Sequence, residues 1–172
     1  PEIVTAVSAA VEMLRGSVGS VVDAPLLFAP ADHHLWVQMW GVFMAAYYGD
    51  EVEQNEGDAD PDVVSLVRLG RSFSAVDAKR MEIARTAVWN RVTSVLADHD
   101  VIVCPTMSVP PGPAAKADHM VTPGDSAADG LLHSEDMTTV WNLVSPLPAV
   151  SVPCGVHGGE NAGLPIGLQI VG

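Results

Sequence analysis

The longest apolar stretch of the chain runs from Leu35 to Tyr48, and its length restricts what it can form. A helix that spans a bilayer needs about 20 apolar residues, whereas this stretch has fourteen and contains Gln38 and Gly41. We therefore predict a helix buried in a protein core and no membrane span. Large apolar side chains at helical spacing are typical of a core and also of an apolar pocket wall. Trp40 is our substrate-pocket candidate from a set that comprises Trp36, Met39, Trp40, Phe43, Met44 and Tyr47.

The balance of charge and hydropathy limits the partners of the chain. Its 8 Lys and Arg against 21 Asp and Glu leave a formal net charge of −13, which repels the phosphate backbone and excludes nucleic acid as an expected partner. Hydrophobic residues make up 48% of the sequence and charged residues 17%, with a mean hydropathy of +0.27. We expect a globular domain whose surplus apolar surface is covered by a further part of the same protein or by a second copy in a homodimer.

The two ends of the chain and its cysteines bear on its origin. The chain opens on Pro1, without an initiator Met, and closes at Gly172 directly after the apolar run 166–171. We expect such a chain to be a piece of a longer polypeptide. No basic segment followed by an apolar segment and a small-residue cleavage site marks a secretory signal. Two cysteines are too few for a disulfide scaffold and suit a reducing compartment equally well, so we expect a cytoplasmic protein.

Helix and strand signals intermingle along the sequence. Apolar residues spaced by four, four and three predict an amphipathic helix between Pro1 and Gly16. A long helix is expected from Ser74, a capping candidate with Asp77 three residues on, to about residue 98. The remaining expectations are strands at 20–23, 101–103, 149–152 and 166–171, an acidic loop at 50–62, an irregular loop at 104–130 and a short helix at 134–142. The pattern indicates an α/β fold in which helices cover a sheet.

The residues by themselves do not assemble a catalytic set. Cys154 and His157 lie three apart in a glycine-rich turn, but a thiolate nucleophile needs an oriented base and a positive neighbourhood, and neither is visible. The pair His33-His34 has no further metal-ligand spacing beside it. The aspartates at 58, 60 and 62 lack the glycine and glutamate of a calcium loop. We predict neither a catalytic residue nor a metal site in the chain.

Three sequence blocks carry a family resemblance. Residues 148–155 read Pro-Ala-Val-Ser-Val-Pro-Cys-Gly, and residues 163–172 read Gly-Leu-Pro-Ile-Gly-Leu-Gln-Ile-Val-Gly. Upstream, residues 100–107 read Asp-Val-Ile-Val-Cys-Pro-Thr-Met and lead into further prolines. These blocks closely resemble the C-terminal region of amidase signature family hydrolases, and together they cover most of residues 74–172.

The resemblance implies a fold, an activity and a division of labour. Family members have a mixed β-sheet with helices on both faces, so residues 1–172 are expected to form the C-terminal part of a single amidase domain. In that family a Ser-Ser-Lys triad hydrolyses an amide to an acid and an amine, without a metal or organic cofactor. The triad and its glycine- and serine-rich signature precede the region matched here. The resemblance therefore assigns no catalytic residue to this chain and implies a catalytic part outside it.

The same resemblance points to substrate-side residues. In the family the loop after the strand approaches the mouth of the active site, which makes Thr106 and Met107 candidates for binding the amide. Asp136 falls where the glutamine-using members, the A subunits of aminoacyl-tRNA amidotransferases, have an aspartate that binds the ammonium group of the substrate.

Departures from the family pattern favour one substrate class. Asn142 stands one position before the usual asparagine, Pro146 replaces a glycine, and residues 65–70 lack the arginine pattern of the glutamine-using members although Arg68 lies close. We therefore expect an amidase for an uncharged or aromatic small-molecule amide. An amidotransferase A subunit is the alternative within the family. A non-catalytic remnant that serves as an interaction domain is the alternative outside enzymes.

Overall fold

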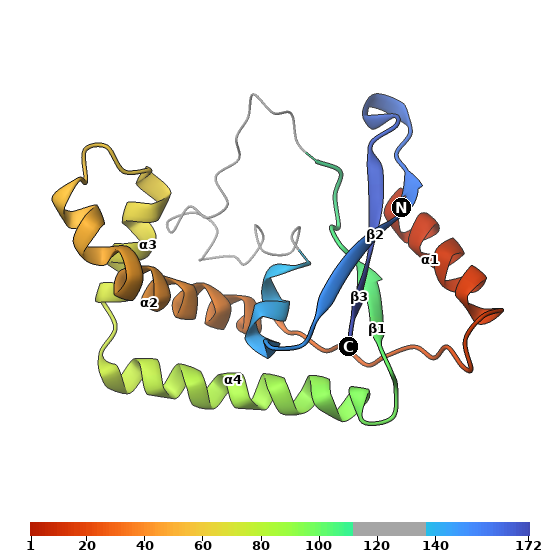
Figure 1. Ribbon diagram of the computed structural model, residues 1–172, viewed down its shortest axis with the longest axis horizontal. Coiled ribbons are helices and arrows are strands. Elements are labelled where there is room, and N and C mark those ends of the chain that lie inside the picture. The colour runs from red at the N-terminus through yellow and green to blue at the C-terminus, as the bar shows by residue number, and fades with distance from the viewer. Residues whose placement is uncertain (112–136) are drawn as a thin grey trace.

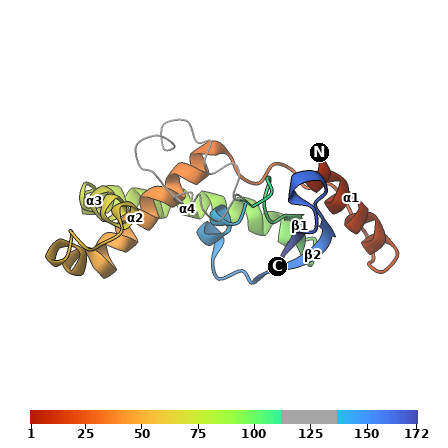
Figure 2. The same cartoon turned by 90° about the horizontal axis from the view of Figure 1, so that it is seen from above.

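The computed structural model describes residues 1–111 and 137–172, which form an elongated molecule. In chain order the elements are α1 (Glu2–Arg15), α2 (Pro30–Gln54), α3 (Pro61–Arg71), α4 (Ala75–Leu96), β1 (Ile102–Pro105), the 3-10 helix η1 (Thr139–Val144), β2 (Ala149–Val156), the 3-10 helix η2 (Gly159–Asn161) and β3 (Pro165–Val171). Figure 1 shows α1 and the sheet at one end, while α2 and α4 extend away from them. Seen from above in Figure 2, α3 and α1 lie at opposite ends.

The sheet has three described strands in the order β1-β3-β2, and β3 pairs antiparallel with both neighbours. Along β3 the residues alternate between faces. Ile166, Leu168 and Ile170 belong to the cluster with α1, whereas Val171 belongs to the cluster with α4 and η1. The predicted α/β class, with helices on both faces of the sheet, is therefore confirmed. Every pairing among the described strands is antiparallel, so any parallel pairing of a mixed sheet lies outside them.

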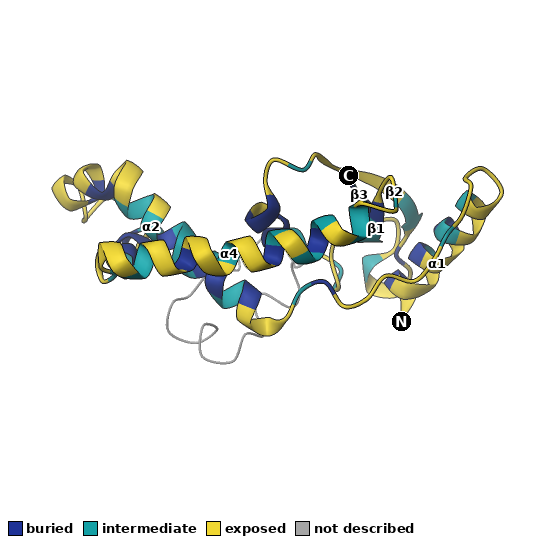
Figure 3. Cartoon of the chain, turned by 90° about the horizontal axis from the view of Figure 1, so that it is seen from below, coloured by how far each residue is buried: buried dark blue, intermediate teal, exposed yellow. Residues whose placement is uncertain are grey.

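The amphipathic helix predicted at the start of the chain is confirmed as α1. Its buried residues Ile3, Val7 and Ala10 pack on Ile166 and Leu168 of the central strand. Burying an aliphatic side chain of this size stabilises a fold by about 1.5–3 kcal/mol relative to exposure. The contact therefore fixes α1 on one face of the sheet, and the other side of the helix is exposed (Figure 3).

The opposite face of the sheet packs on α4 and η1. Val88 and Val92 of α4 and Val144 of η1 are almost fully buried in the same cluster as Val171. The predicted capping box is present, because Ser74 Oγ accepts a hydrogen bond from the N–H of Asp77 at 3.1 Å and the Asp77 carboxylate accepts one from the N–H of Ser74. The prediction of a helix beginning at Ser74 is therefore confirmed.

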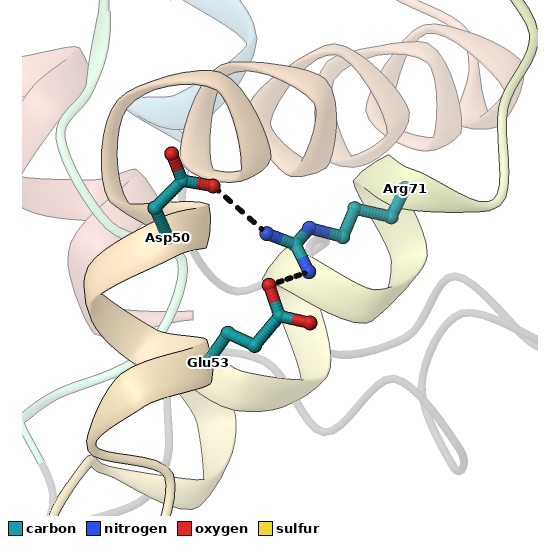
Figure 4. A network of polar contacts seen from close by, with 3 residues as sticks. All are labelled: Asp50, Glu53 and Arg71. Carbon is teal, nitrogen blue, oxygen red and sulfur yellow. Dashed lines mark hydrogen bonds and ion pairs between the residues drawn. The ribbon is translucent and has the colours of Figure 1, made fainter.

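The apolar helix begins earlier and ends later than predicted, because α2 runs from Pro30 to Gln54. At its start the Asp32 carboxylate accepts hydrogen bonds from the N–H of Ala29 at 2.7 Å and from Arg91 at 2.6 Å. At its end the guanidinium of Arg71 pairs with Asp50 and Glu53, as Figure 4 shows. Val52 is buried there against Val64 and Val67 of α3, and the pairing with Arg71 reduces repulsion among the carboxylates. The predicted acidic loop is therefore wrong over residues 50–54.

Three further predictions need correction or restriction. The acidic loop predicted at 50–62 is also wrong over residues 61–62, because residues 61–71 form α3. The Asp60 carboxylate caps this helix by accepting a hydrogen bond from the N–H of Asp62 at 2.8 Å, and Pro61 is its first residue. The predicted strand at 20–23 is wrong, because these residues pair with no described strand. The predicted short helix at 134–142 is a 3-10 helix over 139–144, and its proposed cap Ser134 lies outside the described residues.

Only part of the predicted burial of α2 is observed. Leu35 and Val37 are buried, whereas Phe43, Tyr47 and Tyr48 are exposed. Within the described residues, no helix combines the length and the apolar character that crossing a bilayer requires. The exposed rings of Phe43, Tyr47 and Tyr48 form an aromatic surface on the second half of α2.

The crossing of α2 and α3 depends on two glycines that bring the backbones together. A Cβ atom on Gly70 would lie 1.9 Å from the carbonyl oxygen of Gly41 and 2.8 Å from the Cβ of Ala45. A Cβ on Gly41 would lie 3.2 Å from the carbonyl oxygen of Leu66. Because the obstructing atoms are mainly backbone, a side chain at residue 70 requires the helices to separate.

We predict that Gly70→Ala lowers the free energy of unfolding by about 3 kcal/mol, because overpacking against backbone cannot relax by a rotamer change. Urea denaturation of the variant and the parent protein measures this difference. The matched control is Gly57→Ala, since a Cβ on Gly57 meets no atom within 4 Å. Equal effects of the two substitutions would contradict the close crossing.

Candidate functional site

Two hydroxyl groups from distant parts of the chain meet on the sheet. Thr106 directly follows β1, and its N–H donates to the carbonyl oxygen of Gly167 at 2.9 Å. Ser151 lies on β2, opposite Gln169 of β3. The hydroxyl oxygens of Thr106 and Ser151 are 2.6 Å apart, which is hydrogen-bonding distance. This hydroxyl pair, Thr106 and Ser151, lies above the central strand.

Gly167 makes room for the hydroxyl pair. A Cβ atom on Gly167 would lie 2.6 Å from Thr106 Oγ1 and 2.8 Å from Ser151 Oγ. Both separations are shorter than real Cβ contacts, so any side chain at residue 167 would displace a hydroxyl. The glycine of the Gly-Leu-Gln block is thus required by the packing of the two strands that flank β3.

A buried amide lies next to the pair on the same face of the sheet. Gln169 is 4% exposed, and its Nε2 lies 3.5 Å from both the Cys104 sulfur and the carbonyl oxygen of Met137. Burial raises the pKa of the Cys104 thiol, so it stays protonated near neutral pH. Met107 is 40% exposed beside Thr106. The arrangement offers hydrogen-bonding groups and an apolar side chain, but no general base among these residues.

The predicted substrate-side residues do not all come together. Thr106 and Met107 lie at the end of β1 on the sheet. Trp40 lies on α2, stacked on Trp36 with ring centroids 4.8 Å apart, and it packs with Leu66 of α3. Asp136 lies outside the described residues. The sheet end and the aromatic part of α2 are therefore two separate places, each with its own candidate.

Cys154 and His157 are engaged in the packing of α1. His157 is 5% exposed, and its Nδ1 lies 3.0 Å from the carboxylate of Glu2. The second oxygen of that carboxylate accepts a hydrogen bond from the N–H of Gly158 at 2.7 Å. Cys154 packs against the α1 cluster, and burial raises the pKa of its thiol. A protonated thiol is a weak nucleophile, so this geometry suits a structural role.

Metal-ligating groups do not converge in the part of the chain that the structure describes, where no three His, Cys, Asp or Glu side chains are placed to hold an ion.

Arg68 is the arginine that lies close to the arginine pattern of the glutamine-using family members. It lies on α3 and pairs at the surface with Glu56, in the turn after α2. Its guanidinium is thus neutralised by a carboxylate of this chain.

The comparisons with known proteins decide the family. An amidase family model matches residues 62–172, a span that contains the hydroxyl pair and all three described strands. The chain belongs to the amidase family. It is 36% identical over 128 residues to the A subunit of the glutamyl-tRNA(Gln) amidotransferase of Oceanobacillus iheyensis, a match that covers 73% of this chain and 22% of that protein. The chain thus spans about a fifth of the length of this curated amidase-family relative.

Solved structures show the same fold. A 6-aminohexanoate cyclic dimer hydrolase complexed with substrate superposes with a TM-score of 0.78 at 20% identity, over 99% of this chain and 37% of the other. A bacterial aryl acylamidase of the amidase signature enzymes gives a TM-score of 0.72 at 20% identity, over 99% and 36% of the two chains. At these identities the likeness establishes the amidase signature fold for the chain, as the sequence blocks implied.

Ser151 is the residue of this site that sequence reasoning missed. In the strand predicted at 149–152, Ser151 alternates with Val150 and Val152, so a period of two already places its hydroxyl on the opposite face from the valines. The sequence did not show which strand lies near Ser151 and therefore did not show that a second hydroxyl group faces it. Only the pairing order of the sheet brings Thr106 within reach.

We predict that Glu2→Gln destabilises the protein at pH 7 and that this difference shrinks in acid. The hydrogen bond to His157, then that from Gly158, holds the pKa of Glu2 below its usual 4.5. A carboxyl group with a lowered pKa in the folded state contributes its stability above pH 4.5 and loses it as the pH falls through the folded value. Thermal denaturation between about pH 7 and about pH 3 measures the effect.

The matched control for this prediction is Glu160→Gln. Glu160 is exposed in η2 and makes no ion pair or side-chain hydrogen bond with any described residue. Its substitution should leave the pH dependence of the melting temperature like that of the parent protein. A Glu2 variant with the parent's pH dependence would show that the carboxylate does not hold α1 in place.

Proposed function

We propose that this amidase-family chain is part of an enzyme that hydrolyses a carboxylic amide to an acid and an amine or ammonia. The observation that carries the proposal is the family match over residues 62–172, which includes the sheet with its hydroxyl pair. The bond-breaking Ser-Ser-Lys triad of the family has no counterpart in the 172 residues, so it is assigned to a part of the protein outside this chain. No metal or organic cofactor is required by this chemistry. A cytoplasmic location is part of the proposal, supported by two free cysteines.

The substrate-side role is assigned to the end of the sheet. In a bonded pair of hydroxyls, one O–H is used within the pair and the other is left to donate outward. The Thr106–Ser151 pair can therefore donate one hydrogen bond to the carbonyl oxygen of an amide, and Met107 adds an apolar contact. These residues orient the substrate, and they neither attack it nor accept its proton. Asp136 is proposed as a further substrate contact.

An amidotransferase A subunit is the second candidate, because the relative from Oceanobacillus iheyensis bears that name. The pairing of Arg68 with Glu56 argues against binding of an amino-acid carboxylate at that arginine. An uncharged or aromatic amide is therefore the preferred substrate class. Asp136→Asn distinguishes the two candidates, since loss of a carboxylate weakens binding only of a substrate with a positive group.

If bond cleavage depends on residues outside this chain, a serine-directed reagent should react there. The protein made from its complete gene should hydrolyse amides and be labelled by a fluorophosphonate on a serine outside these 172 residues, identified by peptide mass spectrometry. In that protein Cys154→Ala should leave kcat within about tenfold, since the thiol takes no part in proton transfer. Labelling of a serine within this chain, faster than in the unfolded protein, would contradict the proposal.

We predict that removing either hydroxyl raises KM more than it lowers kcat. Loss of one uncharged hydrogen bond costs about 0.5–1.5 kcal/mol, or about 2- to 10-fold, so Ser151→Ala and Thr106→Val should raise KM by that factor. Thr106→Ser keeps a hydroxyl at the same place and should restore the parent KM. Steady-state kinetics on one aromatic amide measures this, with the exposed Ser17→Ala as a control. Unchanged KM in both hydroxyl-deleting variants would remove the pair from the substrate site.

A further inference from the structure

The proposed function uses the hydroxyl pair on the sheet and assigns no role to the aromatic residues of α2. The second half of α2, the turn that follows and the start of α3 line a hollow of about 760 Å³ that is open to solvent. Its apolar wall includes the large side chains of Trp40, Phe43, Met44 and Tyr48. This volume lies within the range of small-molecule sites, about 300–1,000 Å³, and such sites are usually lined by aromatic and apolar side chains.

The rim of the hollow is negatively charged. Glu51, Asp58 and Asp60 line it, and no Lys or Arg is among its described lining residues. The carboxylates of Glu51 and Asp58 form no hydrogen bond or ion pair with any described residue. The nearby arginines are already occupied, because Arg71 pairs with Asp50 and Glu53 and Arg68 pairs with Glu56. The negative charge is therefore available to a ligand.

We propose that this hollow binds a hydrophobic organic ammonium ion. The faces of Trp and Tyr rings attract a cation, and the carboxylates of Glu51 and Asp58 add charge of the complementary sign. A metal ion fits less well, since these carboxylates do not converge on one point within the described residues. An anionic ligand is opposed by every charged group of the rim. The sequence alone indicated an apolar pocket wall here, and the three carboxylates add a preference for a cation.

This inference does not depend on the proposed amidase function, because its test is a binding measurement. The protein from its complete gene is titrated with phenethylammonium and, as a neutral probe of similar shape, phenethyl alcohol. Ligand-observed NMR at low salt gives both dissociation constants. We expect the cation to bind about fivefold more tightly than the alcohol, with the preference falling as salt screens the carboxylates.

Two kinds of variant test the two parts of the site. Glu51→Gln with Asp58→Asn should reduce the preference for the cation to less than about twofold and leave binding of the alcohol unchanged. Tyr48→Leu, at an exposed position that tolerates the change, should weaken the cation more than the alcohol, because it removes a ring but keeps apolar volume. The matched charge control is Asp23→Asn with Glu160→Gln, which removes two exposed carboxylates away from the hollow.

Each outcome of these experiments either supports or contradicts the proposed cation site. Loss of the preference in the Glu51 and Asp58 variant, with the control unchanged, supports the site. Equal affinities of the parent protein for the two probes, or the same loss in the control variant, would overturn it. Absence of binding of phenethylammonium at millimolar concentration would overturn it as well, whether or not the protein hydrolyses amides.

Discussion

Burial of β3 on both faces is the constraint on which the rest of the structure depends. The strand pairs with β1 on one side and β2 on the other, so its residues hold the positions of both. Ile166 and Leu168 draw α1 onto one face, and Val171 joins the cluster of α4 and η1 on the other. The hydroxyl pair exists because Gly167 has no side chain between these neighbours. Site and core thus share one strand.

Positive charge is scarce, and the described Lys and Arg side chains pair with carboxylates or backbone carbonyl oxygens of the same molecule. With 8 Lys and Arg against 21 Asp and Glu, most carboxylates cannot be paired. Arg91 donates to the carbonyl oxygen of Leu27 and to Asp32, and Arg85 donates to the carbonyl oxygens of Leu143 and Ser145 at 2.6 and 2.9 Å. Arg71 joins the ends of α2 and α3, and Arg68 joins α3 to Glu56 in the turn after α2. The remaining carboxylates give surfaces such as the rim of the aromatic hollow their sign.

The two candidate places differ in how they are built. The hydroxyl pair lies on a sheet whose strands are held together by backbone hydrogen bonds, so the two hydroxyl groups are held in a fixed geometry. The aromatic hollow lies between the second half of α2, the turn that follows and the start of α3, and the ring of Phe43 stacks on the exposed Tyr47 beside the hollow, with centroids 4.4 Å apart. A rigid site suits orientation of a reacting group, whereas an open aromatic surface suits binding of ligands that vary in shape.

Sequence patterns were sufficient to predict the features that depend on near neighbours in the chain. The period of α1, the capping box of Ser74 and Asp77 and the alternation along β3 are all local, and the family blocks were readable without coordinates. Tertiary structure decided the rest. The acidic end of α2 is helical because Val52 is buried against α3 and because Arg71, 18 residues away, pairs with Glu53, and Ser151 meets Thr106 across 45 residues. Such contacts depend on which elements pack together, and local periodicity carries no information about that pairing.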